Sequence, residues 1–328
     1  MKSLPTIALA FLCLGVFSSY AADKPLNIAV IPKGTSHEFW KSINAGAVMA
    51  QQELAAKGVK VNIIWKGPIR EDDRDQQIQV VENFIGRRVD GMVLAPLDSQ
   101  ALVAPVETAL RAKIPVVIID SGLNTDKYAS YIATDNFKGG QLAAEQLGKA
   151  LNGQGKVIML RYQVGSASTE QREAGFMDVM KKKFPNLKLI STDQYAGATR
   201  DSAYQAAQNI LNRFGREVDG VFGPCEPVTI GMMLALKDIG RAGGAVKLVG
   251  FDAGTQSVEG LKNGDVAALI VQNPVRMGYL GVTRMVEHIQ GKKVEKIVDT
   301  GVHVVTRENM NEAAIKELLY PPLDKYLK

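Results

Sequence analysis

Short apolar runs alternate with longer amphipathic stretches along most of the chain. The apolar runs are rich in Val and Ile and are bounded by turn residues, as in strands that are buried inside a parallel sheet. Between them, apolar side chains recur at helical spacing. In the first part of the chain this pattern predicts strands at 27–32, 60–65, 91–95, 115–119 and 129–133 and helices at 38–57, 74–87 and 101–112.

The same alternation begins again after Asp135. Strand–helix–strand units of this kind form parallel, right-handed crossovers with helices on both faces of a sheet. Because the strands are too numerous for one comfortable open sheet, we predict an α/β fold with two doubly wound parallel-sheet lobes. In the second part the predicted helices are 139–151, 169–183, 200–214 and 228–239, and the predicted strands are 156–160, 187–192, 220–222 and 246–251.

The end of the chain is expected to cross back between the lobes, through a strand at 267–272, a helix at 274–290 and a strand at 302–305. A three-segment hinge would then join the lobes near Thr134-Asp135, Gln272-Asn273 and Gly301. The predicted lobes are 24–134 plus 273–301 (N-terminal) and 135–272 plus 302–328 (C-terminal).

The first residues differ from the rest of the chain. A lysine precedes the apolar run Ile7 to Phe17, and small residues follow at Ser19 and Ala21, so we predict a secretory signal peptide at 1–21. The run is too short to span a bilayer. A lipoprotein signal at Cys13 is the less favoured alternative, because a leucine precedes it where such signals need a small residue. We therefore expect an exported, soluble protein.

Composition narrows the function classes. The 328 residues are 46% hydrophobic and 22% charged, which is ordinary for a globular protein and enough for two domains. The formal net charge of +5 is small and spread along the chain, without a basic run or an aromatic and basic module, so we expect no nucleic-acid partner. Cys225 is the single cysteine outside the predicted leader, which excludes an intrachain disulfide in the mature chain.

The first predicted strand ends in a polar loop that carries candidate ligand groups. Lys33 and His37 follow the strand, and Phe39 and Trp40 begin the next helix. In open α/β sheets, small molecules bind at this carboxyl edge. Polar groups beside adjacent aromatic rings suit a polyhydroxylated ligand. The alternative is that both rings are core residues of the helix.

Two aspartates end apolar strands in the same way. Asp120 follows Val116–Ile119, and Asp252 follows Val249-Gly250-Phe251. A carboxylate at such a position is either a ligand group or a helix cap, and we favour the ligand role for Asp120. The acidic cluster Glu71-Asp72-Asp73 favours a helix start over a calcium loop, since the spacing of such a loop is missing.

Several short motifs occur in an order that resembles the sugar-binding branch of the type I periplasmic binding proteins, the soluble receptors of ABC importers. The resemblance covers essentially the whole chain after the leader. Its landmarks are Phe39-Trp40, Val116–Ser121, Ala133–Asn136 with Gly139-Gly140, Gln171-Arg172 before Gly175-Phe176, Val249–Asp252 and Gln272.

The resemblance implies roles for individual residues. Phe39 and Trp40 would cover the sugar faces, Asp120 would accept hydrogen bonds from hydroxyls, and Arg172 would donate from the other lobe. Asp252 and Gln272 would complete the contacts. Carboxylate and guanidinium groups suit sugars because each can hold two neighbouring hydroxyls.

The chain also departs from the ribose-binding members, which have other residues at the positions of His37, Ala95, Ser121, Cys225 and Glu226. We therefore expect a monosaccharide or related polyol whose hydroxyl pattern differs from that of ribose. An acidic sugar is an alternative, since Lys33, His37 and Arg172 would make the pocket partly cationic.

Ile31-Pro32-Lys33 and Trp65–Pro68 are similar to the rhamnose- and autoinducer-binding relatives, in which the lysine reaches the ligand. That comparison adds residues that border the pocket. The full expected set is Lys33, His37, Phe39, Trp40, Asp120, Ser121, Glu170, Gln171, Arg172, Pro224, Cys225, Glu226, Asp252 and Gln272.

The resemblance implies a periplasmic binding protein that closes its lobes on a sugar and delivers it to a membrane permease. An exported sugar hydrolase is a rival, with Cys225 near His37 as a conceivable nucleophile, but a buried cysteine is commoner. The sequence lacks the esterase elbow, the P-loop, the dinucleotide fingerprint and a metal-binding His pair. A chemoreceptor-linked sensor is a third possibility. We predict no catalysis, no cofactor and no bound metal, and a monomer.

Overall fold

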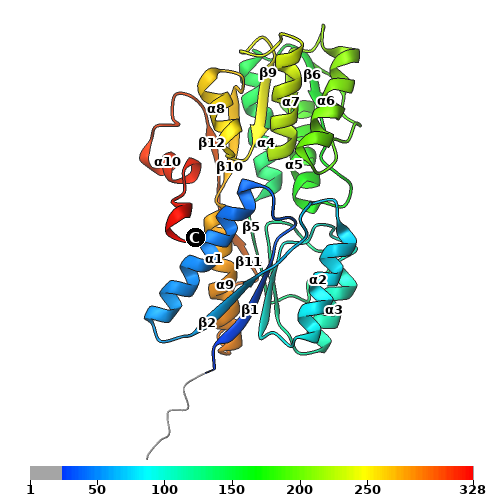
Figure 1. Cartoon of the computed structure of the whole chain (residues 1–328). Coiled ribbons are helices and arrows are strands. Elements are labelled where there is room, and N and C mark those ends of the chain that lie inside the picture. The colour runs from blue at the N-terminus through cyan, green and yellow to red at the C-terminus, as the bar shows by residue number, and fades with distance from the viewer. Residues whose placement is uncertain (1–23, 328) are drawn as a thin grey trace, which may run out of the picture.

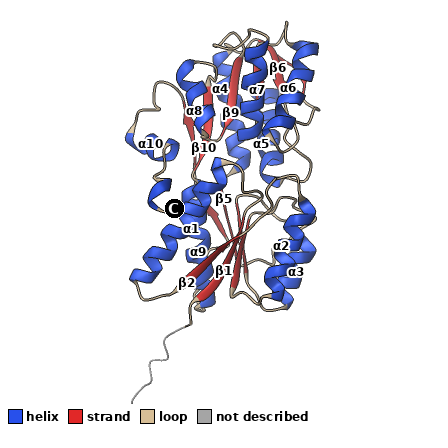
Figure 2. Ribbon diagram, viewed as in Figure 1, coloured by secondary structure: helices blue, strands red, loops and turns tan. Residues whose placement is uncertain are grey.

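The computed structural model describes residues 24–327. The predicted signal peptide lies outside the described residues. Two six-stranded sheets, each covered by helices on both faces, form two lobes stacked end to end (Figures 1 and 2). The predicted α/β fold with two doubly wound lobes is therefore confirmed.

The first lobe contains the sheet with strand order β11-β5-β4-β3-β1-β2, in which every pairing is parallel. One face packs on α1 and α9, and the other packs on α2 and α3. The strands are β1 Leu26–Ile31, β2 Val61–Trp65, β3 Gly91–Leu94, β4 Val116–Ile119, β5 Ser130–Ala133 and β11 Ile297–Asp299. The helices are α1 Glu38–Ala56, α2 Arg74–Gly86, α3 Val103–Arg111 and α9 Pro274–Ile289.

The second lobe has the strand order β12-β10-β9-β8-β6-β7. Its edge strand β12 runs antiparallel to β10, a departure from the parallel sheet that we predicted. Helices α4 and α5 cover one face, and α6, α7 and α8 cover the other. The strands are β6 Gly155–Met159, β7 Leu187–Ser191, β8 Gly220–Phe222, β9 Lys247–Phe251, β10 Ala268–Gln272 and β12 Val302–Val305. The helices are α4 Asn136–Ala150, α5 Ala167–Lys183, α6 Arg200–Phe214, α7 Glu226–Asp238 and α8 Thr255–Asn263.

Close packing of α4 on α5 sets the position of Arg172. A Cβ on Gly140 would lie 1.8 Å from the Arg172 carbonyl oxygen, and a Cβ on Gly175 would lie 2.0 Å from the Phe137 carbonyl oxygen. Only glycine allows two helix backbones to approach this closely. The glycines of this part of the chain therefore hold the α5 backbone against α4.

The chain passes between the sheets three times, at Thr134-Asp135, at Asn273 and at Thr300-Gly301. The first and third of these segments are hydrogen-bonded to each other. The Thr134 hydroxyl donates to the Gly301 carbonyl at 3.2 Å, and the Asp135 N–H donates to Asp299 Oδ1 at 3.2 Å. These crossings agree with the expected hinge segments, while the residue bounds of the lobes stay a prediction.

The C-terminal segment contains elements that we did not predict. Helix α10, Ala313–Leu319, packs Ile315 and Leu319 into the core of the second lobe. The chain then continues to the short 3₁₀ helix η1, Leu323–Lys325, which contacts α1 of the first lobe (Figure 1). The C-terminal segment thus lies against both lobes beside the hinge.

Candidate functional site

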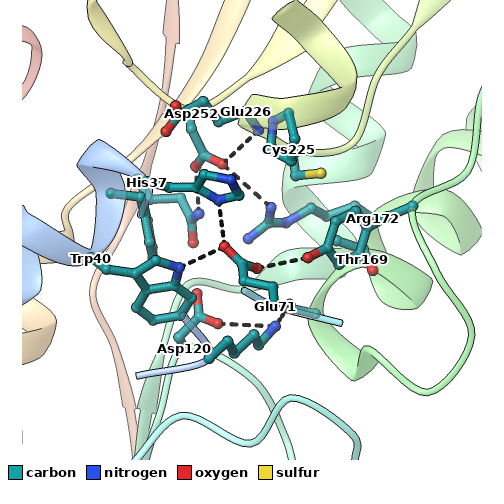
Figure 3. A pocket seen from close by; sticks show the side chains of 15 residues that line it. His37, Trp40, Glu71, Asp120, Thr169, Arg172, Cys225, Glu226 and Asp252 are labelled. Atoms are coloured by element: carbon teal, nitrogen blue, oxygen red, sulfur yellow. Dashed lines mark hydrogen bonds and ion pairs between the residues drawn. The ribbon is translucent and has the colours of Figure 1, made fainter. Parts of the chain in front are cut away.

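The carboxyl ends of both sheets face one cavity between the lobes, where ligands bind in open α/β sheets. The free volume in it is about 30 Å³, room for a few water molecules at most. The lining residues are Lys33, His37, Phe39, Trp40, Glu71, Asp120, Tyr162, Ser168, Thr169, Arg172, Cys225, Glu226, Pro227, Asp252 and Gln272 (Figure 3).

Asp120 and Asp252 occupy equivalent positions in the two lobes. Each directly follows a buried strand, and each adopts a left-handed backbone, with φ of 62° and 69°. Aspartate tolerates this conformation better than most residues, and such outliers cluster at functional sites. The turn brings both carboxylates into the wall of the cavity.

On the first lobe, Lys33 is paired with Asp120. The distance from Lys33 Nζ to Asp120 Oδ2 is 3.2 Å, and both side chains are buried. The same ammonium group donates to Ser166 Oγ at 3.2 Å and to Ser168 Oγ at 3.1 Å, both on the second lobe. Lys33, which lines the cavity, therefore bridges the two lobes.

Glu71 lies at the centre of the site (Figure 3). Its Oε1 accepts from Trp40 Nε1 at 2.7 Å and lies 2.5 Å from His37 Nδ1. Its Oε2 accepts from the Tyr162 hydroxyl of the second lobe at 2.6 Å. Glu71 thus holds the rings of His37 and Trp40 in place and joins the lobes.

Charge supports this pairing of Glu71 with His37. Burial by itself would raise the pKa of Glu71, but the hydrogen bond and charge of His37, with the charge of Lys33, lower it below its ordinary value. Burial would likewise lower the pKa of His37, but the Glu71 carboxylate raises it above 6.5. Both shifts favour the charged forms, so Glu71 and His37 form an ion pair at pH values between their two pKa values.

On the second lobe, Arg172 is held from several sides. Its Nε donates to Asn136 Oδ1 at 2.8 Å, and its Nη1 donates to the Pro224 carbonyl at 2.9 Å. The guanidinium carbon lies 3.9 Å from the centroid of the Phe251 ring. These contacts fix the plane of the guanidinium group at the edge of the cavity.

Asp252 accepts from Gln272 Nε2 at 2.7 Å and from the Glu226 N–H at 3.3 Å. Arg172 Nη1 lies 4.0 Å from its Oδ2. Burial, with smaller effects of Glu226 and Asp120, raises the pKa of Asp252 to about 6, although Arg172 and Gln272 act in the opposite direction.

The cavity brings together ten of the fourteen residues that we expected to bind a ligand. Ser121, Glu170, Gln171 and Pro224 do not line it. The Ser121 hydroxyl accepts from the Ser168 N–H, Glu170 accepts from the Gly165 N–H, and Gln171 is exposed. Ser121 and Pro224 thus support the wall, through Ser168 and Arg172. Ligand contact by any of the fourteen stays a prediction.

Five residues that line the cavity were not among those expected from the sequence: Glu71, Tyr162, Ser168, Thr169 and Pro227. We assigned Glu71 to a helix start, but α2 begins at Arg74 and is capped by Asp73, which accepts from the Gln76 N–H. Tyr162 follows β6 by three residues, so the strand-end position was a usable signal.

The alternative that Phe39 and Trp40 are core residues of the helix is partly right. Trp40, on α1, is buried in the core of the first lobe, yet its indole N–H donates to Glu71. Phe39 is half-buried and meets Trp40 edge-to-face, with 5.0 Å between ring centroids. Trp40 thus serves both the core and the site.

Cys225 is buried, and burial raises the pKa of its thiol well above the ordinary value. A thiol of this kind is a poor nucleophile because the thiolate is the reactive form. Within residues 24–327, no group of three or more His, Cys, Asp and Glu side chains is placed to hold a metal ion.

This fold and site define a clamp-like binding protein. Residues 28–293 match the sequence model of a periplasmic binding protein domain, which covers most of the chain, and the chain therefore belongs to this family. The resemblance seen in the sequence is confirmed.

The relatives include import proteins from several bacteria. The ribose import binding protein of Bacillus subtilis is 27% identical over 89% of this chain and 90% of that protein. A D-ribose/D-allose-binding protein of Pseudomonas aeruginosa is 29% identical over 92% of this chain and 95% of that protein. These relatives are solute receptors, and the chain is accordingly a binding protein rather than an enzyme.

Solved structures of solute-binding proteins are also similar to this chain. An ABC transporter solute-binding protein from Agrobacterium vitis with bound D-fucose has a TM-score of 0.84 and 35% identity, covering 90% of this chain and 100% of that one. A solute-binding protein from Agrobacterium radiobacter in complex with D-arabinose has a TM-score of 0.84 and 32% identity, covering 90% and 99%. Among the helices of residues 24–327, none has the length and apolar character needed to cross a membrane.

Proposed function

We propose that this protein captures a neutral monosaccharide or related polyol between its two lobes in the periplasm and delivers it, chemically unaltered, to the permease of an ABC importer. The observation that carries the proposal is the buried cavity between the lobes, in which charged side chains from both sheets surround an aromatic pair. Relatives named for binding ribose and allose, and structures that hold D-fucose and D-arabinose, support the class of ligand.

The pairing of charges favours a neutral ligand over the acidic sugar that the sequence left open. Lys33 lies beside Asp120, His37 beside Glu71, and Arg172 near Asp252. Each cation thus has a carboxylate neighbour. An anionic ligand would bring an additional negative charge into this balanced site, at a desolvation cost.

The size of the cavity supports movement of the lobes. A sugar ring is several times larger than a water molecule, whereas the free volume is about 30 Å³. Hydrogen bonds of Lys33 and Glu71 to the second lobe join the two walls of the cavity. We propose that the lobes part at the three hinge segments, admit the sugar and close on it.

A thermal-shift screen tests this function. The probes are D-ribose, D-arabinose, D-allose, D-fucose, D-tagatose and xylitol, with D-galacturonate as the anionic comparison. A neutral sugar at a hundredfold excess over its Kd is expected to raise the melting temperature by about 5 °C. Mass spectrometry of the released sugar should show it unaltered. Conversion of the sugar, or stabilisation by D-galacturonate alone, would contradict the proposal.

Export is tested by N-terminal sequencing of the periplasmic fraction, where a mature chain that begins at Ala22 is expected. A second role in chemoreceptor signalling and a monomeric state in solution follow from the resemblance alone and stay predictions.

A further inference from the structure

Helix α8 of the second lobe begins directly after Gly254, a residue with no side-chain oxygen to cap it. The first N–H groups of a helix have no acceptor within the helix and need one from elsewhere. For Thr255, the first residue of α8, the acceptor comes from α1 of the other lobe (Figure 1).

Glu38, the first residue of α1, is that acceptor. Its Oε2 accepts from the Thr255 N–H at 2.8 Å and from the Thr255 hydroxyl at 2.9 Å. The carboxylate also brings a negative charge to the N-terminal end of α8, where the helix dipole stabilises an anion. One side chain of the first lobe thus caps a helix of the second lobe, across 217 residues of sequence.

This contact lies beside the cavity. The neighbours of Glu38 in the chain, His37 and Phe39, line the cavity, and Thr255 follows shortly after the lining residue Asp252. Neither Glu38 nor Thr255 belongs to the three hinge segments, so a rotation of the lobes about those segments moves the carboxylate away from its two donors. Hydrogen bonds of this kind weaken beyond about 3.2 Å, so parting of the lobes breaks the contact.

The contact differs from the other hydrogen bonds between the lobes. Those of Lys33 and Glu71 are buried in the wall of the cavity, so a substitution there also changes the groups that surround a ligand. Thr255 is exposed, Glu38 is half-buried, and neither lines the cavity. Substitutions at this pair therefore change closure without changing the cavity wall.

We propose that Glu38 is a positioning residue for ligand capture, which stabilises the closed arrangement of the lobes by capping α8 from the opposite lobe. This rests on the proposed function and extends it, because the contact sets how long a captured ligand stays bound. A ligand enters while the lobes are apart and the contact is absent, so the association rate does not depend on it. Release requires the lobes to part, so the dissociation rate does.

Stopped-flow fluorescence separates the two rates, with Trp40 in the cavity wall as the signal. The probes are D-ribose, D-arabinose, D-allose and D-fucose. Glu38→Ala removes the acceptor, so we expect the dissociation rate constant to rise about threefold to tenfold, as for the loss of a helix cap. The association rate constant should change less than about twofold.

Two conservative variants test the geometry of the cap. Glu38→Gln keeps the length of the side chain and one acceptor oxygen, so it should release the sugar more slowly than Glu38→Ala. Glu38→Asp keeps the charge but is one methylene shorter, so it should resemble Glu38→Ala. The opposite order would show that charge alone matters and would contradict a cap.

A variant on the other lobe tests the same contact independently. Thr255→Pro removes both donors, and proline is well tolerated at the first position of a helix. The dissociation rate constant should rise to a similar extent as in Glu38→Ala. Because both substitutions break one contact, the double variant should release the sugar no faster than either single variant.

Glu53→Ala is the matched control. Glu53 is an exposed glutamate of the same helix, and it accepts from the Tyr279 hydroxyl at 2.7 Å within the first lobe. Its removal should leave both rate constants unchanged. Melting curves without sugar show whether each variant is folded.

Two results would overturn this role of Glu38 and leave the proposed function intact. One is a sugar that binds but is released at an unchanged rate from both Glu38→Ala and Thr255→Pro. The other is an association rate constant that falls as much as the affinity does, because the contact would then act before the ligand enters. Absence of binding by every probe to the unaltered protein would overturn the proposed function as well.

Discussion

The two walls of the site differ in how their polar groups are used. On the first lobe, Lys33 and Glu71 form hydrogen bonds with other protein groups, several of which belong to the second lobe. On the second lobe, Arg172 and Asp252 are held within their own lobe, and Glu226 and Gln272 keep unpartnered acceptors. The first wall is thus suited to closing the site, and the second wall to discriminating what is inside it.

The largest expected effect comes from breaking the buried pair of the first wall. Asp120→Ala leaves the Lys33 ammonium buried without its carboxylate, which costs about 3–5 kcal/mol in free energy of unfolding. Chemical denaturation measures this loss. Asp72→Ala, which breaks the exposed pair with Arg70, is the control and should cost less than about 1 kcal/mol. Equal losses in free energy of unfolding from the two substitutions would contradict the assignment of Lys33 and Asp120 as a buried ion pair that stabilises the fold.

A smaller effect is expected from the hydrogen bond that joins the walls. Tyr162→Phe removes one donor to the Glu71 carboxylate, a bond of about 1.5–3 kcal/mol, so sugar affinity should fall roughly tenfold to a hundredfold. Calorimetry with the best sugar of the screen measures the change.

Tyr204→Phe is the matched control for that experiment. It removes a hydroxyl that donates to Asp238 within the second lobe, away from the cavity. Affinity should stay unchanged in this variant. If Tyr162→Phe also left affinity unchanged, the hydrogen bond between the lobes would contribute nothing to closure.

The smallest effect concerns pH. The folded-state pKa of His37 is raised, so its stabilising contribution is fully present below pH 6.5 and is lost as the pH rises through the folded value. The stability difference between the unaltered protein and His37→Gln should therefore be greatest at pH 6 and shrink toward pH 9. Melting curves across this range measure it. A difference that grew with pH would show that His37 is neutral when paired with Glu71.

The sequence was informative where function follows from local position. Asp120 and Asp252 could be predicted because each ends a buried strand, and in the structure both stand at the cavity with left-handed backbones. The helices and strands of both lobes were also predictable from their periodicity. Short elements such as β11, α8 and α10 were missed because so few residues carry little periodic signal.

The pairing of Glu71 with Tyr162 was missed for a different reason. Their importance comes from a contact between lobes, across 91 residues of sequence. Locally, Glu71 has the signature of a helix start, and it is Asp73 that caps the helix. A long-range partner cannot be read from such a local pattern.

Small-angle scattering, with and without the best sugar of the screen, tests the central claim most directly. We predict a smaller radius of gyration when calorimetry shows the site to be saturated, because the lobes close about the three hinge segments. Identical scattering profiles for the free and the saturated protein would contradict closure on the ligand.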